Sequence, residues 1–419
     1  MKKTLFVTTL LTFATLLGQA QVQPGSALLG SWTGKLNAMG QKLTLVLHLQ
    51  QAGDSVKATL DSPDQSAKGI PCTAEYLTDD SVAVKVDMIY ATYRARLKDG
   101  KLDGTFTQMG MPFPLVMDKG EEELRRPQTP APPYPYRTEE VTFRNATDSA
   151  TLAGTLTYPQ GYEAMKPGKV PVVLLVTGSG QQNRDEEIFD HKPFLVMADY
   201  LARHGIASLR YDDRATGASV GGEVKHATTA DFMRDAAAGI DYLRSLKAFG
   251  KVGCLGHSEG GTTAFMLAAQ QLADFIVSMA GPGVKGDTLL VMQANSILQR
   301  SGMPALRTVE QYRRQPAIQQ SPWLRWFIDY DPSHDISQAR CPVFALNGSL
   351  DCQVIASQNL TAIQRLLPKQ KKSLVREYPS LNHLFQHATT GLPTEYRQIE
   401  ETISPDVLSD IANWINTLK

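Results

Sequence analysis

Hydrophobic and polar residues alternate with a period of two through most of the stretch from Gly30 to Lys119. In the clearest run, Leu43, Leu45, Leu47 and Leu49 share one face. Similar runs follow at 56–60, 82–89, 92–97 and 102–107, separated by Gly-Asp, Pro-Asp, Asp-Asp and Asp-Gly turns. A period of two is typical of half-buried strands, and short turns between such strands favour an antiparallel meander. We therefore predict a small antiparallel β-barrel or half-barrel over residues 24–120.

The alternation stops at a segment rich in proline. Five prolines fall within nine positions, from Pro127 to Pro135, after a run of three glutamates that begins at Glu121. Such a segment is stiff and extended and cannot join the interior of a sheet. We predict that residues 121–137 form an interdomain linker.

Strands and helices alternate from Thr138 to the end of the chain. After an entry hairpin at 141–158, we expect strands at 170–176, 207–211, 251–255, 275–279, 342–346 and 373–378, and helices at 194–204, 230–246, 260–270, 356–367 and 405–418. This order predicts a doubly wound, mostly parallel sheet with helices on both faces over residues 138–419. Ligand sites of such folds lie at the carboxyl ends of the strands.

Composition narrows the classes of partner. The chain has 419 residues, with 42 Lys and Arg against 42 Asp and Glu, so it has no net field to attract polyanions. We expect a small-molecule partner and no nucleic acid. The four cysteines show no C-x-x-C spacing, and we predict no metal site. Nothing in the sequence indicates the oligomeric state.

The first twenty residues have the features of a secretory signal peptide. Lys2 and Lys3 precede an apolar stretch from Leu5 to Leu17, and small residues lead to a cleavage site after Ala20. No later segment has about 20 uninterrupted apolar residues, so we expect no membrane span after cleavage. The sequence predicts a periplasmic or secreted protein.

A serine stands at the turn between a predicted strand and the next helix. The strand at 251–255 leads into Gly256-His257-Ser258-Glu259-Gly260, and the helix follows directly. Glycines two residues either side of the serine let the strand and the helix pass closely. The pattern Gly-x-Ser-x-Gly occurs readily by chance, so its place at a strand-helix junction is what makes Ser258 the candidate nucleophile.

A serine hydroxyl needs a base to take its proton and a carboxylate to orient that base. In this type of fold the three residues follow in the order Ser, Asp, His. Only His334, His383 and His387 follow Ser258, and His334 precedes the strand whose end should carry the acid. Asp351 comes just after that strand, and His383 lies in the loop after the next one. We predict Ser258, Asp351 and His383 as the catalytic residues and interpret His387 as a helix-surface residue.

The tetrahedral intermediate needs two N–H donors, one from the residue after the nucleophile and one from the loop after the central strand. Glu259 is the first. The loop Thr177-Gly178-Ser179-Gly180-Gln181 supplies the second, from Ser179 or alternatively from Gln181. The loop lacks the Lys-Ser/Thr of a P-loop, so we predict no nucleotide and no other cofactor.

The stretch at 284–330 falls where a helical lid is commonly inserted in this fold. Its aromatic residues Trp323, Trp326 and Phe327 line a substrate pocket if they face the serine, and simple helix packing is the alternative. We interpret the charged cluster from Arg184 to Glu187, beside the loop at 177–181, as a salt-bridged scaffold.

At these motifs the sequence resembles the α/β-hydrolase superfamily, specifically bacterial secreted carboxylesterases of the dienelactone-hydrolase-like and serine-aminopeptidase-like groups with an N-terminal β domain. The motifs are TGSGQQNRDE at 177–186, RYDDRATGAS at 210–219, GHSEGG at 256–261, NGSLDCQV at 347–354 and LNHLFQ at 381–386. The resemblance implies the same three catalytic residues. Ala215 departs from it, because relatives usually have glycine there, and so does Thr177, where many have histidine.

The expected activity is hydrolysis of small or medium acyl esters through an acyl-enzyme intermediate. A serine peptidase of the aminopeptidase type is the first alternative, because the same catalytic residues cleave amides. A non-catalytic protein that binds glycan or lipid is the second.

Overall fold

The computed structural model describes residues 27–38, 41–53, 55–65, 67–121, 124–166, 168–304 and 307–418. The chain divides into two compact units, Met1–Glu123 and Leu124–Lys419, and each is described by itself. The predicted signal peptide lies outside the described residues. Within the described ranges, no helix is both long enough and apolar enough to span a membrane.

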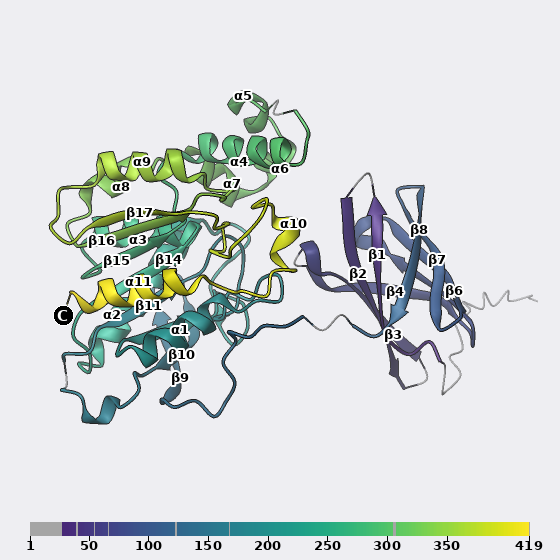
Figure 1. Cartoon of the computed structure of the whole chain (residues 1–419), viewed down its shortest axis with the longest axis horizontal. Helices are drawn as coiled ribbons and strands as arrows, with labels where there is room; N and C mark the ends of the chain where they lie inside the picture. Colours follow the sequence, from purple (N-terminus) through teal and green to yellow (C-terminus); the bar gives the residue numbers. More distant parts are fainter. Residues whose placement is uncertain are drawn as a thin grey trace, which may run out of the picture. The chain divides into compact units, whose positions relative to one another are not determined.

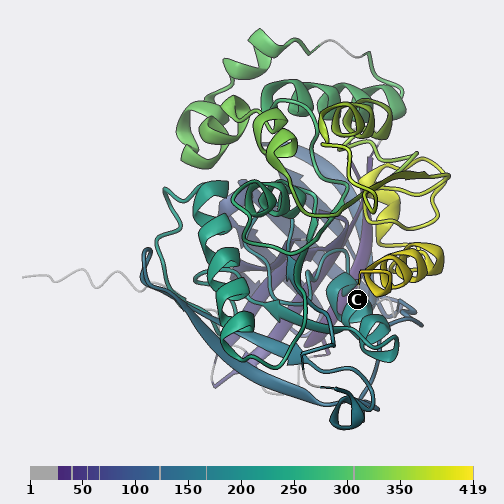
Figure 2. The ribbon, with the colours of Figure 1, turned by 90° about the vertical axis from the view of Figure 1, so that its left-hand side faces the viewer.

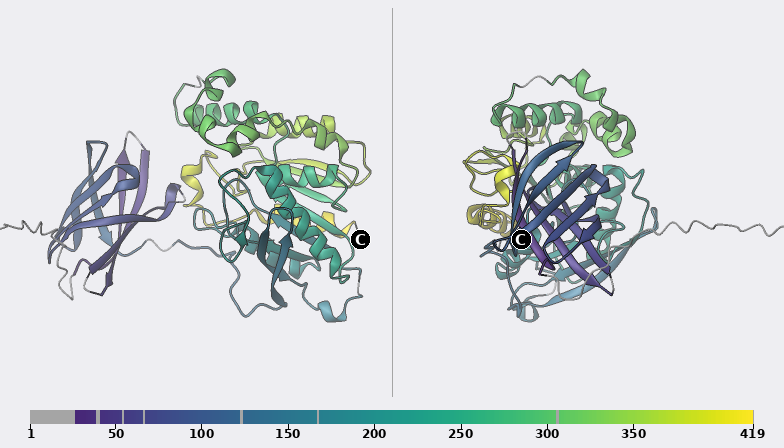
Figure 3. Two further views of the ribbon diagram at one scale, coloured as in Figure 1. Left: turned by 180° about the vertical axis from the view of Figure 1, so that it is seen from behind. Right: turned by 90° about the vertical axis from the view of Figure 1, so that its right-hand side faces the viewer.

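The first unit is a closed antiparallel barrel of eight strands (Figures 1 and 3). The strands are β1 (Gly30–Ala38), β2 (Gln41–Ala52), β3 (Ser55–Ser62), β4 (Ala67–Leu77), β5 (Ser81–Val86), β6 (Ala91–Lys98), β7 (Lys101–Gln108) and β8 (Met111–Lys119). Each pairs with the next, and β8 pairs back with β1 through Trp32 opposite Lys119. Inward side chains such as Trp32, Leu47 and Tyr93 fill the interior. The predicted barrel is confirmed, and its closure leaves no sheet edge.

The second unit is built on a nine-stranded sheet in the order β13-β10-β12-β11-β14-β15-β16-β17, with β9 beside β10. Its strands are β9 (Thr138–Asn145), β10 (Ala150–Thr157), β11 (Val172–Val176), β12 (Ala207–Tyr211), β13 (Val220–Gly221), β14 (Val252–His257), β15 (Ile276–Met279), β16 (Val343–Gly348) and β17 (Leu374–Tyr378). Pairing is antiparallel around β10 and parallel from β12 to β17. The predicted doubly wound, mostly parallel sheet is confirmed.

Helices cover both faces of this sheet because its central strands are apolar on both sides. Along β11, Val172, Leu174 and Val176 belong to one core cluster, whereas Val173 and Leu175 belong to another. The first cluster includes residues of α2 (Thr229–Ser245), α3 (Glu259–Ala269), α8 (Ser333–Gln338) and α9 (Ala356–Leu366); the second includes residues of α1 (Pro193–Arg203) and α11 (Pro405–Asn416). The central strands are therefore fixed from both sides.

Four helices between β15 and α8 form what we call the lid segment, residues 286–329 (green in Figure 2). They are α4 (Gly286–Arg300), α5 (Val309–Arg313), α6 (Pro316–Gln320) and α7 (Pro322–Asp329). Leu289 of α4 and Phe327 of α7 pack together with Val354. Arg313 of α5 donates a hydrogen bond of 2.6 Å to Asp287 of α4 and one of 2.8 Å to Asp329 of α7. These charged contacts join three helices of the lid segment.

From residue 124, the proline-rich segment belongs to the second unit and is hydrogen-bonded to the rest of it. The Arg126 guanidinium donates to the carbonyl of Arg397 at 2.6 Å and to that of Asp190 at 3.1 Å. The Gln128 side chain donates to the carbonyl of Ile403 at 2.7 Å. The boundary between the two units therefore falls at residues 123 and 124, near the start of the segment predicted to link them.

Candidate active site

Ser258 lies on a strained turn between β14 and α3, at the carboxyl end of a central strand. Its backbone has a positive φ, with φ 54° and ψ −116°, which lies outside the allowed regions for a serine and is adopted only where the surroundings impose it. A Cβ on Gly256 would meet the Gly260 carbonyl at 1.9 Å, and one on Gly260 would meet the Val176 carbonyl at 2.2 Å. Both glycines are thus required sterically, as the Gly-x-Ser-x-Gly pattern predicts.

The structure brings Asp351 and His383 together. His383 Nδ1 lies 2.7 Å from Asp351 Oδ2, and both side chains are buried. The other carboxylate oxygen accepts the N–H groups of Gln353 at 2.7 Å and Val354 at 2.9 Å. Because Nδ1 is engaged by the carboxylate, Nε2 is the ring nitrogen that remains available as an acceptor.

The loop after β11 packs against the nucleophile. A Cβ on Gly178 would lie 3.3 Å from the Cβ of Ser258. The Gly178 N–H already donates to Glu186 at 2.9 Å. The next N–H along the loop, that of Ser179, has no hydrogen-bond partner among the described residues. Glu259 is the first residue of α3, where the helix offers no acceptor for its N–H.

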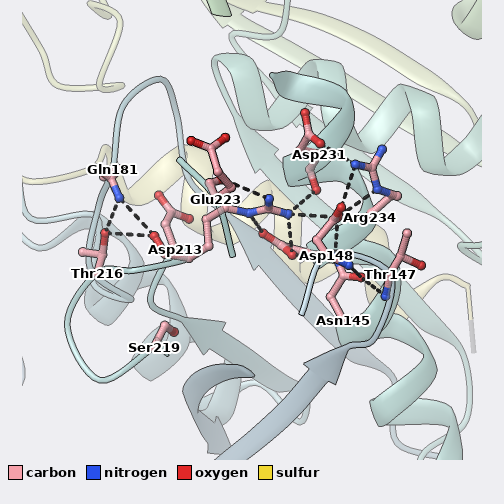
Figure 4. Close-up of polar contacts among 12 residues, drawn as sticks. Asn145, Thr147, Asp148, Gln181, Asp213, Thr216, Ser219, Glu223, Asp231 and Arg234 are labelled. Atoms are coloured by element: carbon pink, nitrogen blue, oxygen red, sulfur yellow. Dashed lines mark hydrogen bonds and ion pairs between the residues drawn. The ribbon is translucent and has the colours of Figure 1, made fainter. Parts of the chain in front are cut away.

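The side chain of Gln181, whose N–H is the alternative donor, bonds to the turn after β12. Its side-chain amide donates to the Arg214 carbonyl at 3.0 Å and to the Thr216 hydroxyl at 3.3 Å (Figure 4). It is not among the residues that line the cavity at Ser258. Gln181 therefore ties the loop after β11 to the turn after β12.

A cavity of about 270 Å³ opens at Ser258 and His383. Its wall is mainly apolar, and the lid segment contributes Leu289, Leu290, Gln293, Trp323 and Phe327. The rings of Trp323 and Phe327 stack with centroids 5.3 Å apart. Trp326, predicted with them, does not line this cavity; its ring stacks on Tyr330 at 4.8 Å and packs against the sheet core. Trp323 and Phe327, four residues apart on α7, thus share the face toward the cavity, whereas Trp326 lies on another face of the helix.

The Glu259 side chain links the nucleophile turn to the lid segment. One carboxyl oxygen accepts the Trp323 indole N–H at 2.8 Å and the Thr229 hydroxyl at 2.5 Å. Burial raises the pKa of Glu259, and the hydrogen bonds from Thr229, Trp323 and Ser179 offset that rise only in part. Burial therefore makes this carboxyl group harder to ionise than an exposed glutamate.

Two residues of the site were given no role by the sequence analysis. Glu186 was grouped with the charged residues of a scaffold, and His257 was only a variable position within Gly-x-Ser-x-Gly. In the structure Glu186 Oε1 lies 2.9 Å from His257 Nδ1, and both line the cavity. The only signal in the sequence is that a histidine precedes the serine and that a glutamate follows the loop at 177–181, which we call the oxyanion loop after its predicted role. This signal does not predict the pairing of the two residues.

The charged residues near the site form three ion pairs, of which Arg214–Asp235 is buried on both sides and the other two are partly buried. Arg184 bonds to Asp212 at 2.8 Å, Arg210 to Asp185, and Arg214 to Asp235 at 2.7 Å. A second layer surrounds Arg214, in which Arg234 bonds to Asp148 at 2.8 Å; Asp148 also accepts from Asn145 and Arg214 (Figure 4). These pairs fix the turn after β12 to the oxyanion loop and to α2.

Ala215, the departure from the family pattern, lies in that turn with φ 55°. The left-handed region favours glycine, which is the residue that relatives usually have there. Ala215 therefore adopts a backbone conformation that glycine adopts more readily.

The fold and the placement of these residues define the class of fold: the second unit has the α/β-hydrolase fold, and the chain adds an N-terminal β-barrel. Residues 198–401 match the model of the prolyl oligopeptidase family. The chain is also similar to Esterase EstD of Thermotoga maritima, with 26% identity over 277 residues that cover 63% of this chain. The match spans 65% of that relative, slightly less than two thirds of its length.

Solved structures with a similar fold include two further esterases. Esterase Pf2001 of Pyrococcus furiosus superposes with a TM-score of 0.44 and 16% identity, covering 67% of this chain and 93% of that one. Est1E of Butyrivibrio proteoclasticus, with ferulic acid bound, superposes with a TM-score of 0.45 and 14% identity, covering 66% and 97%.

Proposed function

We propose that the chain is a serine carboxylesterase that hydrolyses small or medium acyl esters. His383 takes the proton of the Ser258 hydroxyl, and the serine oxygen bonds to the acyl carbon. The tetrahedral oxyanion is held by the N–H groups of Glu259 and Ser179, and its collapse releases the alcohol, which receives its proton from His383. Water, deprotonated by the same histidine, then releases the acid and regenerates Ser258.

The observation that carries this proposal is the Asp351–His383 contact of 2.7 Å beside a cavity that Ser258 also lines. A buried carboxylate on Nδ1 fixes the tautomer in which Nε2 is the base. The similarity to Esterase EstD supports ester hydrolysis as the reaction.

The volume of the cavity supports a small substrate. At about 270 Å³ it lies near the lower end of the range for small-molecule sites, roughly 300–1,000 Å³. Its apolar wall suits an acyl or aryl group, and its size suits a short one.

The prolyl oligopeptidase match makes a peptidase the second candidate. An aminopeptidase needs a carboxylate to bind the substrate's amino group. Two glutamates line the cavity, but Glu186 is paired with His257 at 2.9 Å, and Glu259 accepts hydrogen bonds from Thr229 and Trp323. Both carboxyl groups are engaged within the protein, and this favours the ester.

Two measurements test the proposal. We expect release of p-nitrophenol from acetyl and butyryl esters and little release of aniline from aminoacyl anilides. A fluorophosphonate probe should label the wild-type protein and not Ser258→Ala. Faster cleavage of the anilides would establish the peptidase instead, and absence of labelling would favour the non-catalytic binding protein.

We further propose that the protein is periplasmic or secreted after cleavage behind Ala20. Amino-terminal sequencing of protein recovered from a periplasmic extract tests this, because the mature chain should begin at Gln21. Recovery of a chain that begins at Met1 in the cytoplasmic fraction would overturn it.

A further inference from the structure

Three segments of the candidate site meet at a buried glutamate–histidine pair that the mechanism above does not use. Glu186 Oε1 accepts the N–H of Gly178 at 2.9 Å and lies 2.9 Å from His257 Nδ1. The other ring nitrogen of His257 lies 3.0 Å from the backbone carbonyl of His383. Glu186 is 2% exposed and His257 is 6% exposed. The oxyanion loop, the nucleophile turn and the histidine loop are thus joined through two side chains.

The partners of His257 determine its protonation. A carboxylate faces one ring nitrogen and a carbonyl faces the other, and both partners are acceptors. A neutral imidazole has a single N–H, so only the imidazolium can donate to both. Burial acts to lower the pKa of His257, but the charge and hydrogen bond of Glu186, the His383 carbonyl and the charge of Asp351 outweigh it, and the pKa is raised.

We propose that His257 and Glu186 form a charged pair that positions the backbone of the catalytic histidine and the oxyanion loop. This role rests on the proposed function. The imidazolium donates to the His383 carbonyl and holds its backbone, while Asp351 holds the ring of the same residue from Nδ1. The carboxylate of Glu186 fixes Gly178, so that the N–H of Ser179 is directed at the oxyanion.

The backbone conformation of Glu186 supports a positioning role for the pair. Glu186 has φ 52°, in the left-handed region, and its N–H donates to the Asn183 carbonyl at 2.9 Å. A non-glycine residue keeps this conformation only where its surroundings hold it. The two rings of the site also pack together, with the centroids of His257 and His383 4.8 Å apart.

Glu186→Gln removes the charge and keeps the shape of the side chain. We expect kcat to fall about 10- to 100-fold, because small misplacements of catalytic groups have effects of this size, while KM changes less than about threefold. The matched control is Glu401→Gln. Glu401 is also 2.9 Å from a histidine Nδ1, that of His387, and also accepts a backbone N–H, but it does not line the cavity. The control should keep kcat within about twofold of wild type.

A spectroscopic measurement on the wild-type protein tests the charged pair without relying on activity. In ¹⁵N-edited NMR of histidine-labelled protein, both ring nitrogens of His257 should carry a proton at pH 7, and in Glu186→Gln only one should.

The double variant Glu186→Gln/His257→Gln should lose no more activity than the worse single variant if the two act as a unit.

The outcomes separate this inference from the proposed function. If Ser258→Ala hydrolyses esters as fast as wild type, the proposed function fails. If hydrolysis depends on Ser258 while Glu186→Gln keeps the wild-type kcat, the positioning role alone is overturned. A neutral His257 in the wild-type spectrum overturns the charged pair even if Glu186→Gln is inactive or fails to fold.

Discussion

A single carboxylate decides which nitrogen of His383 is available for the proposed role of base. Asp351 is fully buried, and two backbone N–H groups hold one of its oxygens while the other faces His383 Nδ1. The sequence identified these two residues by their order after Ser258. It did not identify Glu186 and His257, because their pairing depends on a loop conformation that no local pattern encodes.

Asp351→Asn should keep the fold and remove most of the activity. An amide in place of the carboxylate can hold the imidazole in the wrong tautomer, with a proton on Nε2. We expect kcat for a p-nitrophenyl ester to fall by about four orders of magnitude, as for other serine hydrolases with this change. Unchanged thermal unfolding of the variant is the control, and a loss of less than about tenfold would contradict a role for Asp351 in orienting His383.

The buried carboxyl of Glu259 should make stability depend on pH. Because its folded pKa is raised above the ordinary value of 4.5, the folded state binds more protons than the unfolded state, and stability is lost as pH rises above that value. Glu259→Gln removes this loss. We expect the stability of the variant relative to wild type, measured by urea unfolding, to increase from pH 5 to pH 8. A difference that stays constant between these pH values would show that Glu259 is ionised in the fold.

Among the elements, those of the second unit were predicted most closely. The predicted strand at 207–211 coincides with β12, and the predicted helix at 230–246 differs from α2 by one residue at each end. In this unit, continuous apolar runs specify the strands, and clear helical periodicity specifies the helices. The prediction for the first unit was less complete, because no separate run was predicted for β1, β4 or β8. In β4, exposed residues interrupt the alternation, and its pairing with β3 shifts register near Leu60. Barrel closure between β8 and β1 is long-range pairing, which the local pattern does not contain.

The crossing of β11 and α3 should tolerate no side chain at Gly260. A Cβ there would meet the carbonyl oxygens of Val176 at 2.2 Å and Thr177 at 2.6 Å, and backbone atoms cannot move aside cheaply. We expect Gly260→Ala to destabilise the second unit by about 3 kcal/mol or more and to abolish activity. Gly239→Ala in α2 is the matched control.

At Gly239 the nearest atoms are the flexible ends of the Leu174 side chain, at 2.9 and 3.1 Å. Alanine also favours a helix over glycine by about 1 kcal/mol, which offsets the close contact. Gly239→Ala should therefore unfold within about 1 kcal/mol of wild type in a urea titration and stay active. Equal losses in the two variants would mean that the turn at Ser258 does not depend on this close approach.

At the scale of the whole molecule, the two units have separate interiors. The barrel core consists of residues between Leu28 and Met117, and the two cores around the sheet consist of residues between Val141 and Leu418. The sequence predicted this division from a change of hydrophobic period, from two to alternating strands and helices, with prolines between. All proposed catalytic residues belong to the second unit.

Trp32→Ala should therefore unfold the barrel without affecting hydrolysis. Trp32 is fully buried and its indole donates to the Leu28 carbonyl at 2.7 Å, so its loss should cost about 3–5 kcal/mol, a large share of the stability of a small domain. In scanning calorimetry we expect one transition to shift down or disappear, while the other transition and kcat stay unchanged. Phe275→Ala, which leaves a cavity in the core between the sheet, α1 and α11, should lower only the transition temperature of the second unit. If either variant moves both transitions together, the units fold as one, and the barrel is then part of what stabilises the catalytic residues.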